Sequence, residues 1–219
     1  MDKVSQVQGI ERIRFTSPHP KDFPSKLIHL MSERPNICKQ IHMPLQAGND
    51  RVLHKMNRTY TKEEFLSLVS DIRAIIPDIA LSTDVIVGFP TETEDEFQDT
   101  LDVMRRVKFD SAFMFKYSER PNTTASRRFP DDVSDEDKKS RIIRLVDLQA
   151  DISLEKNQAH VGKIQRVLID KIGTKKDPNQ SVARNDANTI VMVPKILGEV
   201  GTYHDVEISS ASPHALMAI

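Results

Sequence analysis

An apolar strand that leads into a glycine-proline turn and a helix start most constrains the fold of this 219-residue chain. Residues 79–87 are nearly all apolar and mostly β-branched, as is typical of a parallel strand covered on both faces. Gly88 removes a side chain where the chain turns, which leaves room for a ligand, and Pro90 fixes the exit from the turn. The pattern indicates either a binding site at the carboxyl end of a strand or an ordinary strand-loop-helix connection.

Capping signals place the helix that follows. Thr91 with Glu94, and Thr93 with Glu96, both have the capping-box spacing, so a helix is expected to start at about Glu94. Its free amides and dipole would face the carboxyl end of the strand, where α/β proteins usually bind ligands.

The first 120 residues repeat a strand-helix pattern. Strands are predicted over residues 12–16, 39–43, 79–87 and 111–117, and helices over 26–32, after Asp50, after Thr61 and from Glu94. Four parallel strands cannot close an eight-stranded barrel, so further strands are expected upstream of a chain that starts late.

The pattern changes after Pro121. Residues 131–137 are an acidic linker, a long helix is expected from Ser134 towards His160, and Gly162 ends it. Alternation with a period of two then runs over residues 164–171, and short strands fit 189–193, 204–209 and 215–219, which predicts a small all-β barrel. The expected domains are residues 1–130, a linker and helix over 131–161, and a barrel over 162–219.

Composition limits the function. With 31 basic and 32 acidic residues there is no global polybasic signal, so any binding of nucleic acid must be local. Cys38 has no second cysteine to pair with and is expected to be a packed thiol. The histidines lack metal-site spacing, so no metal site is expected. No apolar run is long enough for a bilayer, and an intracellular protein is expected.

Basic residues occur in and near the loops of the expected barrel. They can present ammonium and guanidinium groups to RNA phosphates, or they can be an ordinary solvated surface. Tyr203 is the only aromatic residue after Phe129, so stacking groups for bases are scarce. The candidate RNA-binding residues are Lys163, Arg166, Lys171, Lys175, Lys176 and Arg184.

A polar cluster follows the second expected strand. Gln46 and Asn49 lie at the same end of the sheet as Gly88, and their amides can bond a ribose or a carboxylate. Alternatively, Asn49 or Asp50 simply caps the next helix, and both roles can coexist.

Several motifs together resemble one family. They are residues 42–53 (HMPLQAGNDRVL), 56–58 (MNR), 60–64 (YTKEE), 81–90 (LSTDVIVGFP) and 113–121 (FMFKYSERP). The chain resembles the tRNA methylthiotransferases, which use radical S-adenosylmethionine (SAM) chemistry. The resemblance implies an α/β part of a (β/α) radical SAM barrel, followed by a small all-β TRAM barrel that binds RNA. Residues 175–178 and 183–188 favour the branch that acts on tRNA over the ribosomal-protein branch.

The resemblance implies that a methylthio group is added to an isopentenylated adenosine next to the anticodon. The implied partner is the anticodon stem-loop of a tRNA in the cytoplasm or an organelle, with no membrane, and the sulfur donor is left open. In the family one [4Fe-4S] cluster cleaves SAM and a second supplies sulfur, each held by three cysteines that this chain lacks. The chain alone is therefore not expected to catalyse the reaction, and its catalytic residues are left open.

The resemblance also suggests cofactor contacts. Gln46 and Asn49 resemble ribose-side contacts, and Asp84, Gly88 and Pro90 resemble the strand-turn motif near the adenosyl group. Tyr117 and Ser118 follow the last barrel strand and are expected to line the adenine.

Some residues depart from the family pattern. Asn49 replaces a serine, Thr91 replaces a glycine and so narrows the turn, and residues 183–185 depart from Gly-Arg-Thr. Two alternatives to a tRNA methylthiotransferase stay open: a non-catalytic protein that binds RNA or adenosyl groups, and a methylthiotransferase that acts on a ribosomal protein.

Overall fold

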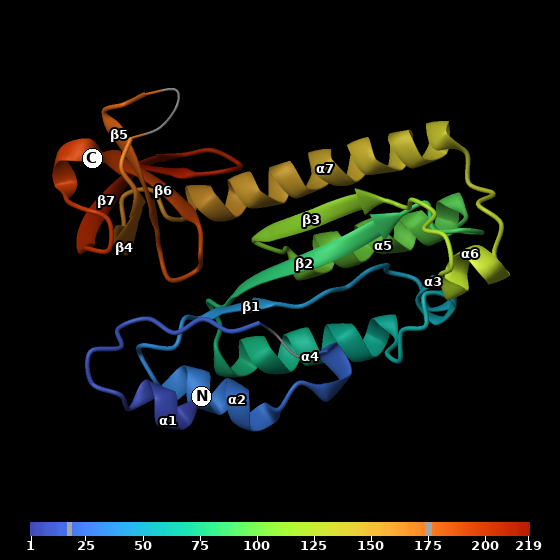
Figure 1. The fold of residues 1–219 in the computed structure, drawn as a ribbon, viewed down its shortest axis with the longest axis horizontal. Coiled ribbons are helices and arrows are strands. Elements are labelled where there is room, and N and C mark those ends of the chain that lie inside the picture. Colours follow the sequence, from blue (N-terminus) through green and yellow to red (C-terminus); the bar gives the residue numbers. More distant parts are fainter. Residues whose placement is uncertain (17–18, 174–176) are drawn as a thin grey trace. The chain divides into compact units, whose positions relative to one another are not determined.

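The computed structural model describes residues 1–16, 19–173 and 177–219, and the chain forms two compact units. The sheet unit consists of Phe15–Glu33 and Ile41–Gln149. The barrel unit consists of Met1–Arg14, Arg34–Gln40 and Ala150–Ile219. Each unit is described by itself, with the elements labelled as in Figure 1.

A three-stranded sheet of order β1-β2-β3 organises the sheet unit. Its strands are β1 (Gln40–His42), β2 (Ala80–Val87) and β3 (Ser111–Lys116), and β2 pairs with β3 in parallel (Figure 1). The strand predictions at 39–43, 79–87 and 111–117 are confirmed. Their carboxyl ends lead into the loops that carry the site.

Helices follow the strands as the capping signals indicate. Their bounds are η1 (Pro20–Asp22), α2 (Ser25–Glu33), α3 (Asp50–Lys55), α4 (Lys62–Ile75), α5 (Glu94–Val107) and α6 (Thr124–Arg128). Thr61 and Thr93 form capping boxes with Glu64 and Glu96, so Thr93 rather than Thr91 caps α5. The apolar faces of α4 and α5 are buried, with Phe65, Ile72, Phe97, Leu101 and Met104 in the core.

The barrel unit contains a closed barrel of order β4-β5-β6-β8-β7. The strands are β4 (Ile164–Lys171), β5 (Gln180–Arg184), β6 (Ile190–Pro194), β7 (Tyr203–Ala211) and β8 (Leu216–Ala218), with η2 (Lys195–Leu197) after β6 and α1 (Asp2–Ser5) near the N-terminus. Alternate β-branched and aliphatic side chains fill its core. The sequence therefore predicted the barrel correctly and missed only β5.

Residues 12–16 do not form the predicted strand. Ile13 makes a single parallel bridge to Ile37, with Ile13 N–H donating to Asn36 O at 2.7 Å and Cys38 N–H donating to Ile13 O at 3.0 Å. The prediction was wrong because only Ile13 pairs with another segment, whereas the Arg12 and Arg14 guanidinium groups bind the carbonyls of Arg184 and Asn185.

One long helix, α7 (Asp135–Gln158), contributes residues to both units. Ser134 caps it, since Ser134 Oγ accepts a hydrogen bond from Asp137 N–H at 3.0 Å. The predicted α/β part followed by a small all-β barrel is confirmed. None of the described helices has the length and apolarity to cross a membrane.

Candidate functional site

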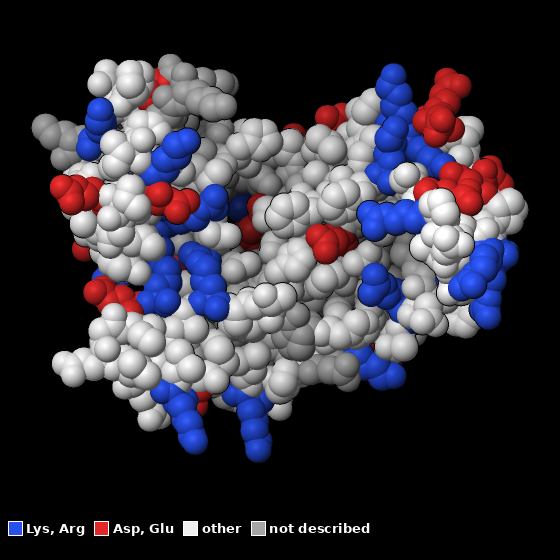
Figure 2. Space-filling view, viewed as in Figure 1, with Lys and Arg blue, Asp and Glu red and all other residues white. Residues whose placement is uncertain are grey.

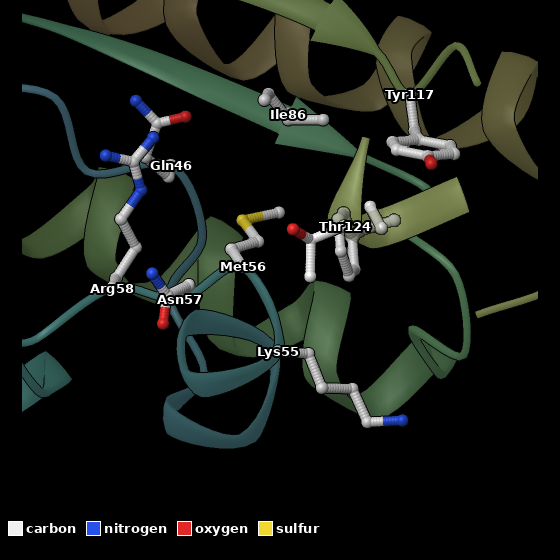
Figure 3. A pocket seen from close by; sticks show the side chains of 10 residues that line it. Gln46, Lys55, Met56, Asn57, Arg58, Ile86, Tyr117 and Thr124 are labelled. Carbon is white, nitrogen blue, oxygen red and sulfur yellow. The ribbon is translucent and has the colours of Figure 1, made fainter. Parts of the chain in front are cut away.

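A pocket of about 200 Å³ lies in the sheet unit, in the loops after the strands. Figure 3 shows its lining side chains, which are Gln46, Lys55, Met56, Asn57, Arg58, Ile86, Phe89, Tyr117, Thr124 and Ala125. They come from the carboxyl ends of the strands and from α3 and α6. Such a combination of apolar walls and a few polar groups is typical of a small-molecule site.

The polar end of the pocket is formed by Gln46 and Arg58. Gln46 has a positive φ of 66° and bridges to β2, where its N–H donates to Asp84 O at 2.8 Å. Asn57 adopts a left-handed φ of 57° after α3, which suits asparagine and redirects the chain at Arg58. In Figure 3 the Gln46 and Arg58 side chains lie at the end of the pocket away from Tyr117.

Arg58 carries a donor without a partner. Its Nε is buried and makes no hydrogen bond within the described structure. A buried, unsatisfied guanidinium N–H is costly, and the positive charge of Arg58 at this end of the pocket favours an anionic group in the ligand. This end of the pocket is therefore suited to a carboxylate.

The other end of the pocket is aromatic. Tyr117 follows β3, and its ring packs edge-on against Phe89 with centroids 5.2 Å apart. Burial raises the pKa of the Tyr117 hydroxyl, with smaller contributions from Asp131 and Glu119, so Tyr117 stays neutral at physiological pH. A flat apolar wall with a neutral hydroxyl suits a heteroaromatic ring.

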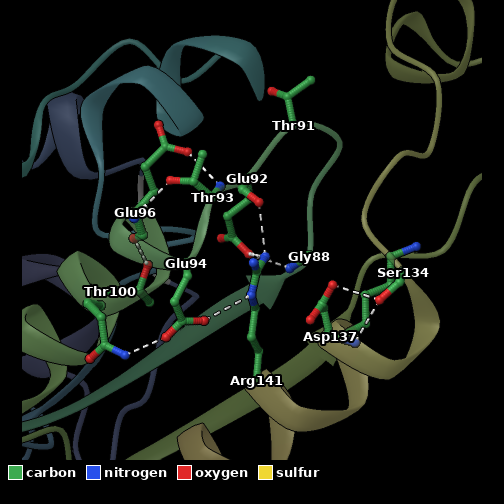
Figure 4. Close-up of polar contacts among 12 residues, drawn as sticks. Gly88, Thr91, Glu92, Thr93, Glu94, Glu96, Thr100, Ser134, Asp137 and Arg141 are labelled. Carbon is green, nitrogen blue, oxygen red and sulfur yellow. Dashed lines mark hydrogen bonds and ion pairs between the residues drawn. The ribbon is translucent and has the colours of Figure 1, made fainter.

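The turn after β2 is closed by an ion pair from α7. Glu92 Oε2 accepts from Gly88 N–H at 2.6 Å and from Arg141 Nη1 at 3.0 Å, and both side chains are almost fully buried (Figure 4). Burial raises the pKa of Glu92, which Gly88 N–H and Arg141 oppose. The pair fixes the turn that carries Phe89.

Lys138 fills the space beside Gly88. Gly88 has a φ of +71°, and a Cβ there would lie 2.3 Å from Lys138 Cγ. The Lys138 Nζ is held by both carboxylate oxygens of Asp131 at 2.6 Å and lies 5.7 Å from the Tyr117 ring centroid. Glycine is thus required here for packing against α7, whereas the sequence suggested room for a ligand.

The cofactor residues predicted from the sequence separate into two groups. Gln46 and Tyr117 line the pocket. The other five, Asn49, Asp84, Gly88, Pro90 and Ser118, are not among its lining residues.

The five have other contacts or surroundings. Asn49 caps α3, since its Oδ1 accepts from Arg51 N–H at 3.0 Å, as one of the sequence alternatives proposed. Asp84 lies 3.2 Å from His42 Nε2, Pro90 is buried in the turn, and Ser118 is exposed.

Sequence reasoning missed Arg58, Lys55 and Phe89. Residues 56–58 served only for the resemblance to the family. Asparagine tolerates a left-handed φ, so Asn57 before Arg58 could have predicted a turn that points the arginine side chain in a new direction. Lys55 Nζ donates to Thr91 Oγ1 at 2.6 Å and lies 4.9 Å from the Phe129 ring centroid, which no local pattern predicts.

The candidate RNA residues are spread over the barrel. Lys163 and Lys171 are exposed at the two ends of β4. Arg166 pairs with Glu11 at 2.5 Å and Arg184 with Asp170 at 3.1 Å. Lys175 and Lys176 lie outside the described residues.

Cluster ligands are lacking in this chain. Cys38 is 4% exposed, and burial raises the pKa of its thiol. Among the described residues, no group of three His, Cys, Asp or Glu side chains is arranged to hold a metal ion. A single buried thiol does not fit a [4Fe-4S] cluster, which needs several thiolates.

Two family models match the chain. The radical SAM superfamily model covers residues 2–104, and the TRAM domain model covers residues 158–219. The chain is therefore similar to the radical SAM superfamily over its N-terminal part and to the TRAM domain at its C-terminal end. The TRAM match coincides with the barrel and the end of α7.

Several curated proteins that are similar to this chain share one enzyme name. The chain is 46% identical to the tRNA-2-methylthio-N(6)-dimethylallyladenosine synthase of Caldicellulosiruptor saccharolyticus, over 99% of this chain and 45% of that protein. It is 45% identical to the protein of that name from Acidothermus cellulolyticus, over 97% of this chain and 43% of the relative. The chain thus spans less than half the length of these relatives, and the predicted resemblance to tRNA methylthiotransferases is confirmed.

A solved structure supports the fold. Coproporphyrinogen III oxidase (HemN) from Escherichia coli, described as a radical SAM enzyme, matches with a TM-score of 0.53 and 16% identity. The match covers 78% of this chain and 45% of that one, and it concerns the fold alone.

Proposed function

We propose that this chain forms the cofactor wall and the RNA-binding end of a tRNA methylthiotransferase. The observation that carries the proposal is the pocket whose polar end holds Arg58, with an Nε that has no hydrogen-bond partner among the described residues, and whose other end is aromatic. The relatives named as tRNA-2-methylthio-N(6)-dimethylallyladenosine synthases support the reaction class.

S-adenosylmethionine suits the two ends of the pocket. Its methionine carboxylate would accept from Arg58, the Gln46 amide would bond the ribose hydroxyls, and Tyr117 with Phe89 would pack against the adenine. When bound, S-adenosylmethionine supplies the methyl group and the radical precursor. The residues of this chain bind it, orient it and exclude water.

The remaining predicted residues act on the pocket from outside. We propose that Asp84, Gly88 and Pro90 set the path of β2 and its turn, and that Asn49 sets the start of α3. Ser118, next to Tyr117, stays a predicted adenine contact. The cluster ligands would be supplied by cysteines that this chain does not contain, so no step of the reaction is assigned to its residues.

The barrel is the proposed RNA-binding part. Lys163, Arg166, Lys171, Lys175, Lys176 and Arg184 are the proposed phosphate contacts, and the anticodon stem-loop of a cytoplasmic tRNA is the proposed partner. The TRAM match supports this assignment.

Binding of S-adenosylmethionine to the whole chain tests the pocket. Calorimetry should give saturable one-site binding, and Arg58→Gln should weaken it about 10-fold or more, because a hydrogen bond between charged groups contributes roughly 1.5–3 kcal/mol. Arg106→Gln is the matched control, since Arg106 is half exposed on α5 and lies outside the pocket.

Two results would refute the pocket assignment. One is a wild-type chain that binds no S-adenosylmethionine, and the other is an equal loss of affinity in both variants. The proposed RNA binding is tested separately. Binding of the chain to an anticodon stem-loop is compared with its binding to a ribosomal-protein peptide.

A second candidate function is RNA binding without catalysis. The chain's one thiol favours it, because Cys38 is buried and burial raises its pKa. Iron content and mass of the protein purified from its source separate the two: bound iron in a longer chain supports the enzyme, and an iron-free 24.9 kDa chain supports the binding protein.

A further inference from the structure

Arg12 pairs with the Asp186 carboxylate in the barrel unit, and the same carboxylate acts electrostatically on Arg14 and Lys39. Arg12 and Arg14 come from the segment before the bridge at Ile13, Lys39 follows Cys38, and Asp186 lies in the turn between β5 and β6. We call Arg12, Arg14 and Lys39 the N-terminal cation cluster. Because Asp186 contributes one negative charge and the cluster three positive charges, the region has an excess of positive charge.

The two arginines bind the barrel turn directly. Arg12 Nη2 lies 2.7 Å from Asp186 Oδ1, and Arg12 Nη1 donates to Arg184 O at 2.9 Å. Arg14 Nη2 donates to Asn185 O at 2.7 Å. The path of residues 184–186 is therefore set by a segment that lies about 170 residues earlier in the sequence.

Arg12 and Arg14 differ in whether their charge is paired with a carboxylate. The Arg12 side chain is 7% exposed and its charge is paired, so it serves the fold. Arg14 is half-buried, and its Nη1 is a buried donor with no hydrogen-bond partner within the described residues. Desolvation lowers the pKa of Arg14 and of Lys39, because partial burial disfavours the charged form of each side chain. A bound anion would stabilise both charged forms.

The cluster continues a basic surface of the barrel. The guanidinium carbons of Arg12 and Arg166 lie 5.0 Å and 4.4 Å from the centroid of the Tyr203 ring, and Arg184 flanks the same turn. Figure 2 shows Lys and Arg side chains gathered on this unit, with acidic groups beside them. Glu11 and Asp170 already pair with Arg166 and Arg184, whereas no carboxylate forms a salt bridge with the half-buried Arg14 among the described contacts, so its charge is the less compensated one.

We propose that Arg14 and Lys39 bind a backbone phosphate of the RNA, and that Arg12 positions the 184–186 turn beside it. The RNA-binding surface then includes residues 10–14 and 36–39 from the radical SAM segment in addition to the TRAM barrel. This inference rests on the proposed RNA-binding function and names a contact that the barrel sequence alone does not contain.

The test is the salt dependence of tRNA binding by the whole chain, measured by fluorescence anisotropy. Loss of one phosphate contact lowers the slope of log K against log salt by about 0.9. Arg14→Gln should lower the slope by about this amount and weaken binding several-fold at low salt, across RNA sequences. Arg34→Gln is the matched control, because Arg34 is an exposed arginine of the same unit that pairs with Asp2.

Lys39→Gln is the second variant, in case Arg14→Gln disturbs the fold. The Lys39 Nζ donates to Arg34 O at 2.9 Å, a contact that a shorter side chain gives up at small cost, and the slope should fall as for Arg14→Gln. Thermal melts of each variant establish that the barrel is folded.

The outcomes separate the two proposals. A wild-type chain that binds no tRNA refutes the proposed RNA function. Normal wild-type binding with an unchanged slope in both variants refutes the phosphate contact alone. If inorganic phosphate raises the melting temperature of wild type and not of Arg14→Gln while the tRNA slope is unchanged, the site takes free phosphate and the inference is refuted for RNA.

Discussion

Replacing Gly88 with alanine tests why the turn after β2 needs glycine. The residue has a φ of +71°, which costs an L-residue roughly 1–2 kcal/mol. The new Cβ would also lie 2.3 Å from Lys138 Cγ and 3.3 Å from Lys138 Cδ. Cγ is near the backbone of α7 and the Lys138 Nζ is held by Asp131, so the side chain cannot swing aside freely.

We expect Gly88→Ala to lower the free energy of unfolding of the sheet unit by about 2–5 kcal/mol, the sum of backbone strain and roughly 1–3 kcal/mol of overpacking. In a Lys138→Ala background the clash is absent, and only about 1–2 kcal/mol should remain. The coupling between the two changes is then about 1–3 kcal/mol.

Urea unfolding of the four chains, followed by circular dichroism, measures this cycle. Gly9→Ala is the control for backbone strain alone, because Gly9 has a φ of +86° and nothing within 4 Å of its added Cβ. An equal loss for Gly88→Ala in both backgrounds would refute the role of Lys138. Stronger binding of S-adenosylmethionine in the absence of Lys138 would instead support a ligand at this glycine.

Three further changes have definite expected outcomes. Arg141→Met should lower the free energy of unfolding by about 3–5 kcal/mol near pH 8, because it leaves the Glu92 carboxylate charged and buried. The pKa of Glu92 is raised in the folded state, so stability is lost as pH rises through that pKa. The cost of the substitution should therefore shrink towards pH 5, which denaturation at the two pH values measures. Thr91→Gly should stabilise the chain by up to about 1 kcal/mol, because Thr91 has a left-handed φ of 70°; a lower melting temperature would mean that its bonds to Lys55 and Arg51 outweigh the strain. Cys38 should resist alkylation by iodoacetamide at neutral pH and react fully in denaturant, since burial raises its pKa; rapid labelling of the native chain would contradict this.

Local chemistry made much of the fold predictable. The capping boxes at Thr61 and Thr93 and the glycine after α7 lie within a few residues of the helix ends they mark, so the sequence contains both partners. Strand β5 was not predicted, because Gln180–Arg184 has only five residues and follows a polar turn, so its alternation of apolar and polar residues is too short to recognise.

The rest depends on contacts across long stretches of sequence. The requirement for glycine at position 88 comes from contact with Lys138, fifty residues later in the sequence. The place of Arg58 at one end of the pocket is set by the path of the loop after α3. The bonds of Arg12 and Arg14 to the carbonyls of Arg184 and Asn185 join residues about 170 positions apart, so no local pattern predicts them. Gln46 and Tyr117 were found from the sequence because each directly follows a strand.

The two units differ in their strand edges. The barrel closes on itself and has no unpaired strand edge, whereas the order β1-β2-β3 leaves β3 with one unpaired side among the described residues. Phe113 and Phe115 on that strand are 58% and 52% exposed. In concentrated solution this chain should therefore self-associate through β3, and this exposed apolar surface would limit its storage and expression.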